Sequence, residues 1–251
     1  MDHTLSELMV AAAAREIREG ETVFVGMRLP LLAFLLAKST HAPNAVGFFE
    51  NGVIRDTPSV AMLYTMSDPP NINGAVFCGE MLTVMGSLQR GAIALGFIGG
   101  AQIDRFGNLN TTMVGEGARA TRLPGSGGAC DIASLAHRTL IIMAHERRRF
   151  VERVDYCTSP GYGNGGDWRE RVGLPRGGPA AVITTRGVIR FSDDTHEAYL
   201  ASYHPRITIA EIRANTGWDL RVAPSVSETG PPTAAELDVI RRLDPEKFWT
   251  S

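Results

Sequence analysis

The amino-acid sequence predicts an α/β protein, built on an open, mostly parallel β-sheet with helices on both faces. Short β-branched or apolar runs alternate with helix-length apolar segments over the first 150 residues, which is the pattern of successive strand-helix-strand units. Residues 93–98 and 140–143 are apolar throughout or nearly so, as strands buried on both faces are. With 44% hydrophobic residues, the 251-residue chain can fill a large core, and we expect one domain over residues 1–251.

The first helix is predicted over residues 5–17. Thr4 and Glu7 have the spacing of a capping box, apolar residues follow at helical intervals, and Gly20 ends the pattern. A strand at 22–25, a helix at 31–38 after Pro30, and a strand at 46–49 complete the first strand-helix-strand unit.

The later elements follow from the same signals. We expect strands at 75–78, 93–98, 140–143, 198–203 and 220–223, a hairpin over 182–191, and helices at 81–89, within 126–136, at 208–214 and after Thr233. The glycine-rich, charged stretch 161–178 is interpreted as a long surface loop.

Charge and composition exclude several classes of function. The 25 basic and 27 acidic residues give a net charge of −2, so no electrostatic footprint for nucleic acid or an anionic membrane is expected. No apolar run reaches the roughly 20 residues of a membrane helix. Lys38 and Lys247 are the only lysines, and neither lies in a G-K-[ST] phosphate loop.

The cysteines and the start of the chain favour the cytoplasm. The three cysteines are widely spaced and lack a C-x-x-C pair, which argues for reduced thiols and against a zinc site or a disulfide framework. The first residues lack the positively charged start of a secretory signal. We therefore expect a cytoplasmic protein without a metal site.

Four further features are weaker candidates for a functional site. The G-x-G-x-x-G at 161–166 lacks the flanking strand and helix of a dinucleotide site, so we interpret it as a loop. His145-Glu146 resembles the start of a metalloprotease helix, but Arg149 stands where the second histidine is needed. The arginines at 147–149 are interpreted as a solvated strand end rather than a phosphate site. Cys130 is interpreted as a packing residue.

Two segments can carry catalysis. Gly125, Gly127 and Gly128 precede a predicted helix, where backbone N–H groups can stabilise an oxyanion, although an ordinary tight turn explains them equally well. Glu50 follows an apolar parallel strand, at the edge where open α/β sheets bind ligands. Partial desolvation would make its carboxylate a nucleophile, and a turn-capping role is the equal alternative.

Spaced segments along the whole chain resemble the B (beta) subunits of family I CoA-transferases, above all those of the glutaconate CoA-transferase type. They are Glu50-Asn51-Gly52, Gly99-Gly100-Ala101-Gln102-Ile103-Asp104, Gly107-Asn108-Leu109-Asn110, Gly125-Ser126-Gly127-Gly128-Ala129, Thr158-Ser159-Pro160-Gly161 and Asn215-Thr216-Gly217.

The resemblance implies a fold, a mechanism and a partner. It implies the CoA-transferase (NagB/RpiA/CoA-transferase-like) fold, and an A (alpha) subunit that shares the active site. CoA would pass from an acyl-CoA to a carboxylic acid, such as a glutaconate-like dicarboxylate, through a thioester on Glu50. CoA is then a substrate and a covalent intermediate, and no permanently bound cofactor is implied.

The resemblance also implies roles for the other segments. Backbone N–H groups of Gly127, Gly128 and Ala129 would bind the thioester oxyanion. Asn51, Gly99, Gly100 and Gln102 would line the substrate side.

Two alternatives stay open. Relatives of this fold include a CoA-thioester hydrolase of steroid ring opening and a decarboxylase, both without glutamate at the position of Glu50, and retention of Glu50 favours transfer. A CoA-ester or sugar-phosphate sensor would carry a helix-turn-helix segment, for which we find no spare length. Phe49 stands where many members have a small polar residue, and Asn51 replaces the serine of the glutaconate CoA-transferase type, so a less polar acyl pocket is expected.

Overall fold

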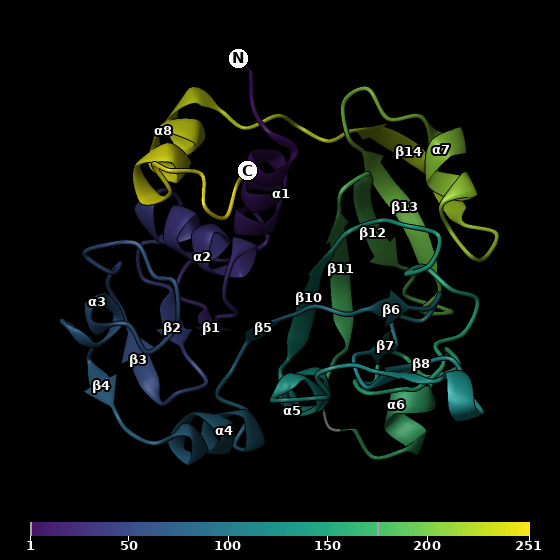
Figure 1. Ribbon diagram of the computed structural model, residues 1–251, viewed down its shortest axis with the longest axis horizontal. Helices are drawn as coiled ribbons and strands as arrows, with labels where there is room; N and C mark the ends of the chain where they lie inside the picture. The colour runs from purple at the N-terminus through teal and green to yellow at the C-terminus, as the bar shows by residue number, and fades with distance from the viewer. Residues whose placement is uncertain (1, 175) are drawn as a thin grey trace. The chain divides into compact units, whose positions relative to one another are not determined.

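The structure is a computed structural model that describes residues 2–174 and 176–251. The chain forms two compact units (Figure 1). Unit 1 comprises residues 2–97 and 230–251, and unit 2 comprises residues 98–229. Among the described residues, no helix is long and apolar enough to cross a membrane.

Unit 1 contains a sheet with the strand order β5-β1-β2-β3-β4. Strand β1 is parallel to both β2 and β5, whereas β3 is antiparallel to both β2 and β4. Its elements are α1 (Leu5–Ala14), β1 (Thr22–Phe24), α2 (Leu29–Ser39), β2 (Val46–Phe48), β3 (Val53–Arg55), α3 (Pro69–Ile72), β4 (Phe77–Cys78), α4 (Met81–Gln89), β5 (Leu95–Ile98) and α8 (Ala234–Leu243).

Helices α1, α2 and α8 pack against one another in unit 1. The predicted capping box is present, because the Thr4 side chain accepts from the Glu7 N–H and the Glu7 carboxylate accepts from the Thr4 N–H. Glu7 is fully buried, and Arg241 of α8 donates to it at 2.8 Å. Burial alone would raise the pKa of Glu7, but the bonds from Arg241 and Thr4 hold it below its ordinary value.

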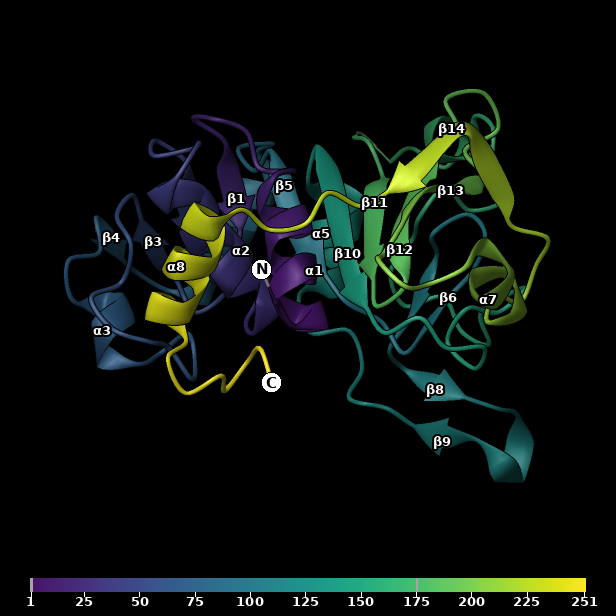
Figure 2. The same cartoon turned by 90° about the horizontal axis from the view of Figure 1, so that it is seen from above.

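Unit 2 contains a sheet with the order β10-β11-β12-β13-β14. The β10–β11 and β13–β14 pairs are parallel, and β12 is antiparallel to both of its neighbours. Figure 2 shows that the β8–β9 hairpin projects from this unit. The elements are β6 (Gln102–Ile103), β7 (Leu109–Asn110), β8 (Met113–Val114), η1 (Gly117–Arg119), β9 (Thr121–Arg122), α5 (Ala129–Leu135), β10 (Arg138–Met143), α6 (Trp168–Arg171), β11 (Pro179–Thr184), β12 (Gly187–Phe191), β13 (Ala198–Tyr203), α7 (Ile209–Ala214) and β14 (Arg221–Glu228).

The predicted α/β class is confirmed, and the predicted helices and strands are present with boundaries shifted by a few residues. Two expectations need correction. The stretch 161–178 is not only a surface loop, because it contains α6 and the buried Arg169. The strand expected at 220–223 continues to Glu228, since it pairs along β13. The short strands β3 and β6–β9 were not predicted.

Candidate functional site

Glu50 lies on a tight turn directly after β2, at the carboxyl end of a strand that runs parallel to β1. The Phe49 N–H donates to Val53 O at 2.9 Å, and the Gly52 N–H donates to Phe49 O at 2.9 Å, so the backbone on both sides of Glu50 is fixed. The Glu50 side chain is half-buried and forms no hydrogen bond or ion pair with another described residue. Its carboxylate is therefore not committed to capping the turn.

Gly52 is required at this turn for two independent reasons. Its φ of +99° is a conformation that side-chain-bearing residues rarely adopt. A Cβ atom at this position would also lie 2.3 Å from Gly79 O, which no flexible side chain could relieve because the neighbour is backbone. The Gly79 N–H in turn donates to Gly52 O at 3.0 Å, so the turn is tied to the end of β4.

Asn51 connects the Glu50 turn to the following loop. Its Nδ2 donates to Met66 O at 2.8 Å and to Ser67 Oγ at 3.3 Å. The Nδ2 of the buried Asn71 donates to the same Met66 carbonyl at 2.7 Å. The Asn51 amide thus has internal partners, and its predicted contact with substrate remains a prediction.

Arg55 is a buried residue that sequence reasoning missed. It is 2% exposed, and within the described parts of the chain its guanidinium donates only to backbone carbonyls. The acceptors are Thr57 O at 3.1 Å, Pro58 O at 3.0 Å, Pro70 O at 3.2 Å, Asn71 O at 2.6 Å and Asn73 O at 2.8 Å. Burial lowers the pKa of Arg55 from its ordinary value, while Asp56 opposes this shift. No local sequence pattern distinguishes Arg55 from other arginines on strands, so its hydrogen bonds to the loop 56–74 could not be predicted.

The glycine loop of unit 2 precedes α5, as predicted. Gly125 and Gly127 have φ values of +98° and +50°. The N–H groups of Gly127 and Gly128 donate no hydrogen bond to another described residue, whereas the Ala129 N–H donates to Ser126 O at 3.0 Å. Two free N–H groups therefore follow one another in this loop, and the third predicted donor, Ala129, is already engaged.

Gln102 is buried, at 4% exposure, and both ends of its amide have partners. Its Oε1 accepts from Asn110 Nδ2 at 2.7 Å and from the Asp155 N–H at 3.1 Å, and its Nε2 donates to Asp155 Oδ2 at 3.2 Å. Gly100 packs tightly, since a Cβ there would lie 2.8 Å from Leu109 Cδ2, while Gly99 is exposed. Substrate contacts by Gln102, Gly99 and Gly100 stay predictions.

His145 is a core residue of unit 2. It is 1% exposed, and its ring stacks on Phe150 with the centroids 3.8 Å apart. Nδ1 lies 3.2 Å from Thr184 Oγ1, and Nε2 lies 3.0 Å from Thr216 Oγ1. Burial, together with the charge of Arg186, lowers the pKa of His145 to about 3. The imidazole is therefore neutral near pH 7.

The arginines after His145 have partners within the unit. Arg147 donates to Thr216 O, and both Arg148 and Arg149 pair with Glu146. Hydrogen bonding from Arg148 is the main cause that lowers the pKa of Glu146. This arrangement agrees with a strand end whose charges are locally paired.

The G-x-G-x-x-G stretch packs against a turn instead of opening a nucleotide-binding helix. The Gly161 and Gly163 N–H groups donate to Asn108 Oδ1 at 3.0 and 3.1 Å. Asn108 Nδ2 donates to the buried Asp104 at 2.9 Å. Burial raises the pKa of Asp104, although the bonds from Asn108 oppose it. The glycines of this stretch therefore have a packing role.

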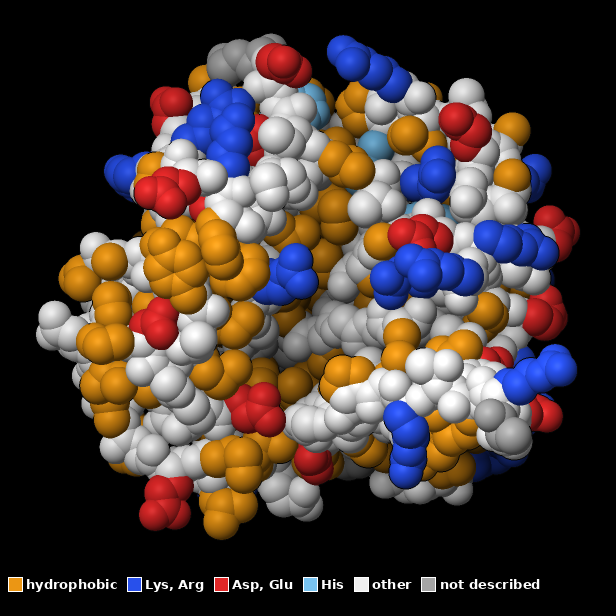
Figure 3. All heavy atoms as spheres, viewed as in Figure 1, with side chains coloured by type: hydrophobic (Ala, Val, Ile, Leu, Met, Phe, Trp, Pro, Cys, Tyr) orange, Lys and Arg blue, Asp and Glu red, His pale blue; other side chains and the backbone are white. Residues whose placement is uncertain are grey.

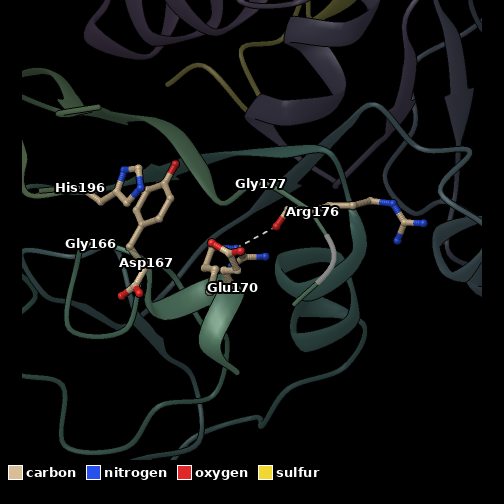
Figure 4. A pocket seen from close by; sticks show the side chains of 8 residues that line it. Gly166, Asp167, Glu170, Arg176, Gly177 and His196 are labelled. Atoms are coloured by element: carbon tan, nitrogen blue, oxygen red, sulfur yellow. Dashed lines mark hydrogen bonds between the residues drawn. The ribbon is translucent and has the colours of Figure 1, made fainter. Parts of the chain in front are cut away.

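A pocket of about 310 Å³ lies beside α6 (Figure 4). Tyr162 stacks on His196 there, with ring centroids 4.2 Å apart. Arg169 lines the pocket, but it donates to Arg176 O at 2.9 Å, Gly161 O at 2.9 Å and Ala133 O at 3.1 Å. Burial lowers the pKa of this guanidinium. Since its donors already bond to backbone carbonyls, Arg169 holds the loop together and does not mark an anion site.

The cysteines differ from expectation in one respect. Cys130 is exposed, so its interpretation as a packing residue is wrong; the side chain of the helix's first turn faces outward. Cys78 and Cys157 are also free and exposed. Among residues 2–174 and 176–251, no group of three or more His, Cys, Asp or Glu side chains could hold a metal ion.

Comparison with known proteins gives a consistent result. The family model described as coenzyme A transferase matches residues 6–215. The chain is 40% identical to the B subunit of 3-oxoadipate CoA-transferase from Pseudomonas knackmussii, over 96% of this chain and 94% of that protein. It is 36% identical to the B subunit of glutaconate CoA-transferase from Acidaminococcus fermentans, over 97% and 94%. The IpdB subunit of the cholesterol ring-cleaving hydrolase of Mycobacterium bovis is 26% identical over 98% and 96%.

Solved structures agree with the sequence relatives. The crystal structure of glutaconate coenzyme A-transferase from Acidaminococcus fermentans superimposes with a TM-score of 0.92 at 34% identity, covering 100% of this chain and 98% of that one. The decarboxylase AibA/AibB gives a TM-score of 0.84 at 25% identity, covering 99% and 98%. The predicted fold is thereby confirmed, and the chain belongs to the coenzyme A transferase family.

Proposed function

We propose that this chain is the B subunit of a heteromeric CoA-transferase, which moves CoA from an acyl-CoA to a carboxylic acid through a glutamyl-CoA thioester on Glu50. The observation that carries the proposal is the state of the Glu50 carboxylate. It lies half-buried after a parallel strand, on a turn whose backbone is fixed, and has no partner among the described residues. A positioned carboxylate without an internal partner is suited to attack a bound thioester.

The reaction balances without an oxidant, a reductant or a metal. The Glu50 carboxylate attacks the thioester carbonyl, and CoA thiolate leaves to give an acyl-glutamyl anhydride. The thiolate then attacks the Glu50 carbonyl of the anhydride, which forms glutamyl-CoA and releases the first acid. The acceptor carboxylate attacks glutamyl-CoA, and the expelled thiolate attacks the new acyl carbonyl. Glu50 is regenerated, and the two half-reactions predict ping-pong kinetics.

The glycine loop supplies the backbone N–H donors that the mechanism needs. Each tetrahedral intermediate carries an oxyanion, which converging N–H donors stabilise. The N–H groups of Gly127 and Gly128 have no acceptor in the described chain, whereas Ala129 donates to Ser126. Gly127 and Gly128 are therefore the stronger oxyanion donors of the three predicted residues.

The substrate and the partner are proposed from the relatives. Two relatives, at 40% and 36% identity, are named for 3-oxoadipate and glutaconate, both dicarboxylic acids, which favours a dicarboxylate as one substrate. They are also named as B subunits, which favours an A subunit as partner.

An exposed apolar surface on unit 1 supports the proposal of a partner subunit. Figure 3 shows hydrophobic side chains gathered over the side of the unit that carries α3, β4 and α4. Leu82 is 70% exposed and Val60 is 75% exposed, and β4 is the last strand of the sheet order. Exposed apolar surface beside a sheet edge favours burial against another chain. The other large apolar side chains exposed between residues 60 and 82 are Tyr64, Ile72, Val76, Phe77 and Met81.

Acceptor dependence tests the proposal. The chain is co-expressed with an A subunit, and the purified complex is assayed with a panel of acyl-CoA esters and carboxylates. We expect CoA to move to an added carboxylate such as acetate, and Glu50→Gln to lower kcat at least about 10³-fold. The matched variant Glu246→Gln removes an exposed carboxylate of the same unit and should retain activity.

The alternative is a CoA-ester hydrolase or carbon–carbon bond-cleaving enzyme, which the similarity to the cholesterol ring-cleaving hydrolase favours. Release of free CoA without any acceptor, at a rate that Glu50→Gln does not change, would establish the alternative and refute transfer.

A further inference from the structure

We propose that Thr158 is a positioning residue for the glycine loop, and hence for stabilisation of the thioester oxyanion; this inference rests on the proposed function. Thr158 touches neither the loop nor Glu50 in any described hydrogen bond. It acts through a short relay of hydrogen bonds within unit 2, which runs from its hydroxyl to Thr111 and Thr112 and then to Leu123 and Gly125.

The relay starts where the backbone hydrogen bonds between Leu109 of β7 and the segment 158–159 end. Leu109 O accepts from both the Thr158 N–H, at 2.8 Å, and the Ser159 N–H, at 3.1 Å. The Thr111 N–H bonds to the Thr158 side chain instead, which accepts it on Oγ1 at 2.9 Å. The same oxygen lies 2.8 Å from Thr112 Oγ1, with one hydroxyl donating to the other. Thr158, at 7% exposure, thus fixes both residues that follow β7.

Two backbone hydrogen bonds then connect Thr111 and Thr112 to the segment that leads into the glycine loop. Thr112 O accepts from the Leu123 N–H at 2.9 Å, and Thr111 O accepts from the Gly125 N–H at 2.8 Å. These bonds close the base of the β8–β9 hairpin and hold the segment that leads into Gly127 and Gly128. The position of the loop's first residue therefore depends on two carbonyls whose own residues Thr158 fixes.

The loop is not tightly packed at this end. A Cβ atom built on Gly125 or on Gly127 would meet nothing within 4 Å, so no neighbouring atom occupies the space where a side chain would begin. At its other end the loop is fixed by α5, where the Ala129 and Cys130 N–H groups bond to Ser126. Loss of the Thr158 hydroxyl would remove its bonds to Thr111 and Thr112, while the bond from the Thr112 N–H to Asn110 Oδ1 and the β8–β9 pairing would remain. Since an oxyanion donor works only at the correct position, such loosening would lower kcat.

Ser159 provides a matched control. It follows Thr158 directly and is also buried, at 1% exposure, yet its Oγ has no hydrogen-bond partner among the described residues. Removal of that hydroxyl should leave the relay intact. A purely structural effect of altering this buried segment would instead appear in both variants.

The test compares Thr158→Val, Thr158→Ser and Ser159→Ala in the complex with the A subunit. For Thr158→Val we expect hydrogen exchange at the Leu123 and Gly125 amides to accelerate about 10- to 100-fold, which corresponds to the loss of a buried hydrogen bond. We also expect kcat to fall about 10-fold or more, with KM for the acyl-CoA changed by less than about 3-fold. Thr158→Ser should restore both quantities, and Ser159→Ala should match the wild type.

Three results would overturn the inference: unchanged exchange in Thr158→Val, faster exchange with unchanged kcat, or equal effects of Ser159→Ala. Should Thr158→Val fail to fold, Thr112→Val removes only the partner hydroxyl, and it must accelerate the same amides or the inference is refuted. The exchange rates do not require catalysis. A wild-type complex without CoA transfer would therefore refute the proposed function while still showing whether Thr158 holds the loop.

Discussion

Titration of His145 is predicted to make unit 2 sensitive to acid. Its pKa is about 3 in the folded chain, against an ordinary value of 6.5, because burial and Arg186 disfavour the imidazolium. In the unfolded chain the ring takes up a proton below pH 6.5, whereas the folded chain resists protonation until about pH 3. Stability present above pH 6.5 is therefore lost as the pH falls toward 3, and at pH 4.5 the loss is about 3 kcal/mol.

The assay compares urea unfolding of the wild type and of His145→Gln at pH 7.5 and 4.5, followed by circular dichroism. Carboxylates that titrate in both proteins contribute equally to the two pH differences, so the excess acid loss of the wild type reports on His145. We expect this excess to be about 3 kcal/mol. An equal loss in the two proteins, or an imidazole NMR titration of His145 with a midpoint between pH 6 and 7, would refute the reasoning.

Three further predictions concern unit 1 and are measured as changes in the free energy of unfolding. Arg55→Met should destabilise the chain by about 3–5 kcal/mol, because five backbone carbonyls lose their hydrogen-bond donor. Arg119→Met, which alters an exposed arginine, should cost less than about 0.5 kcal/mol, and similar losses in the two variants would contradict the assigned role of Arg55. Gly52→Ala should cost roughly 2–4 kcal/mol, because the new side chain would combine a positive φ with a clash against the Gly79 backbone. Gly20→Ala has a positive φ but no atom near the new Cβ, so it should cost about 1 kcal/mol, and the reverse order would be inconsistent with the close approach of Gly79. Glu7→Gln should cost about 1–3 kcal/mol at pH 7, with the difference from wild type vanishing as acid protonates Glu7. A difference that persists once Glu7 is protonated would exclude the ionic contribution of Arg241.

The parts of the fold that the sequence predicted are those governed by local signals. The predicted capping box at Thr4 is present, and the helices predicted at 208–214 and after Thr233 also begin with capping boxes, because a threonine three residues before a glutamate satisfies exposed N–H groups whatever the tertiary context. The hairpin of β11 and β12 likewise follows from its turn at Arg186 and Gly187.

The parts that the sequence did not predict depend on contacts between distant segments. Strand β3 pairs with β2 and β4, but at three residues it is too short to show a periodic pattern in the sequence. The buried roles of Arg55 and Arg169 arise from carbonyls brought together by folding. An arginine whose donors meet only backbone oxygens has the same sequence signature as a solvated one.

The candidate site divides in the same manner. The turn of Glu50 and the glycine loop were predictable, because a strand end and a run of glycines before a helix are local features. The internal partners of Asn51 and Gln102 were not, since Met66 and Asp155 are 15 and 53 residues away in the chain. The contribution of Thr158 was also hidden, because its acceptor role exists only where the backbone hydrogen bonds between β7 and the segment 158–159 end.

Trapping of the glutamyl-CoA thioester tests the central claim most directly. The complex with the A subunit is incubated with an acyl-CoA and then with borohydride, which reduces a glutamyl thioester to the alcohol, and the modified residue is located by mass spectrometry. Our account predicts that the label falls on Glu50, requires the acyl-CoA, and disappears when an acceptor carboxylate is present in excess. Turnover of the acyl-CoA with Glu50 unlabelled would contradict the account and make the chain part of a hydrolase or lyase.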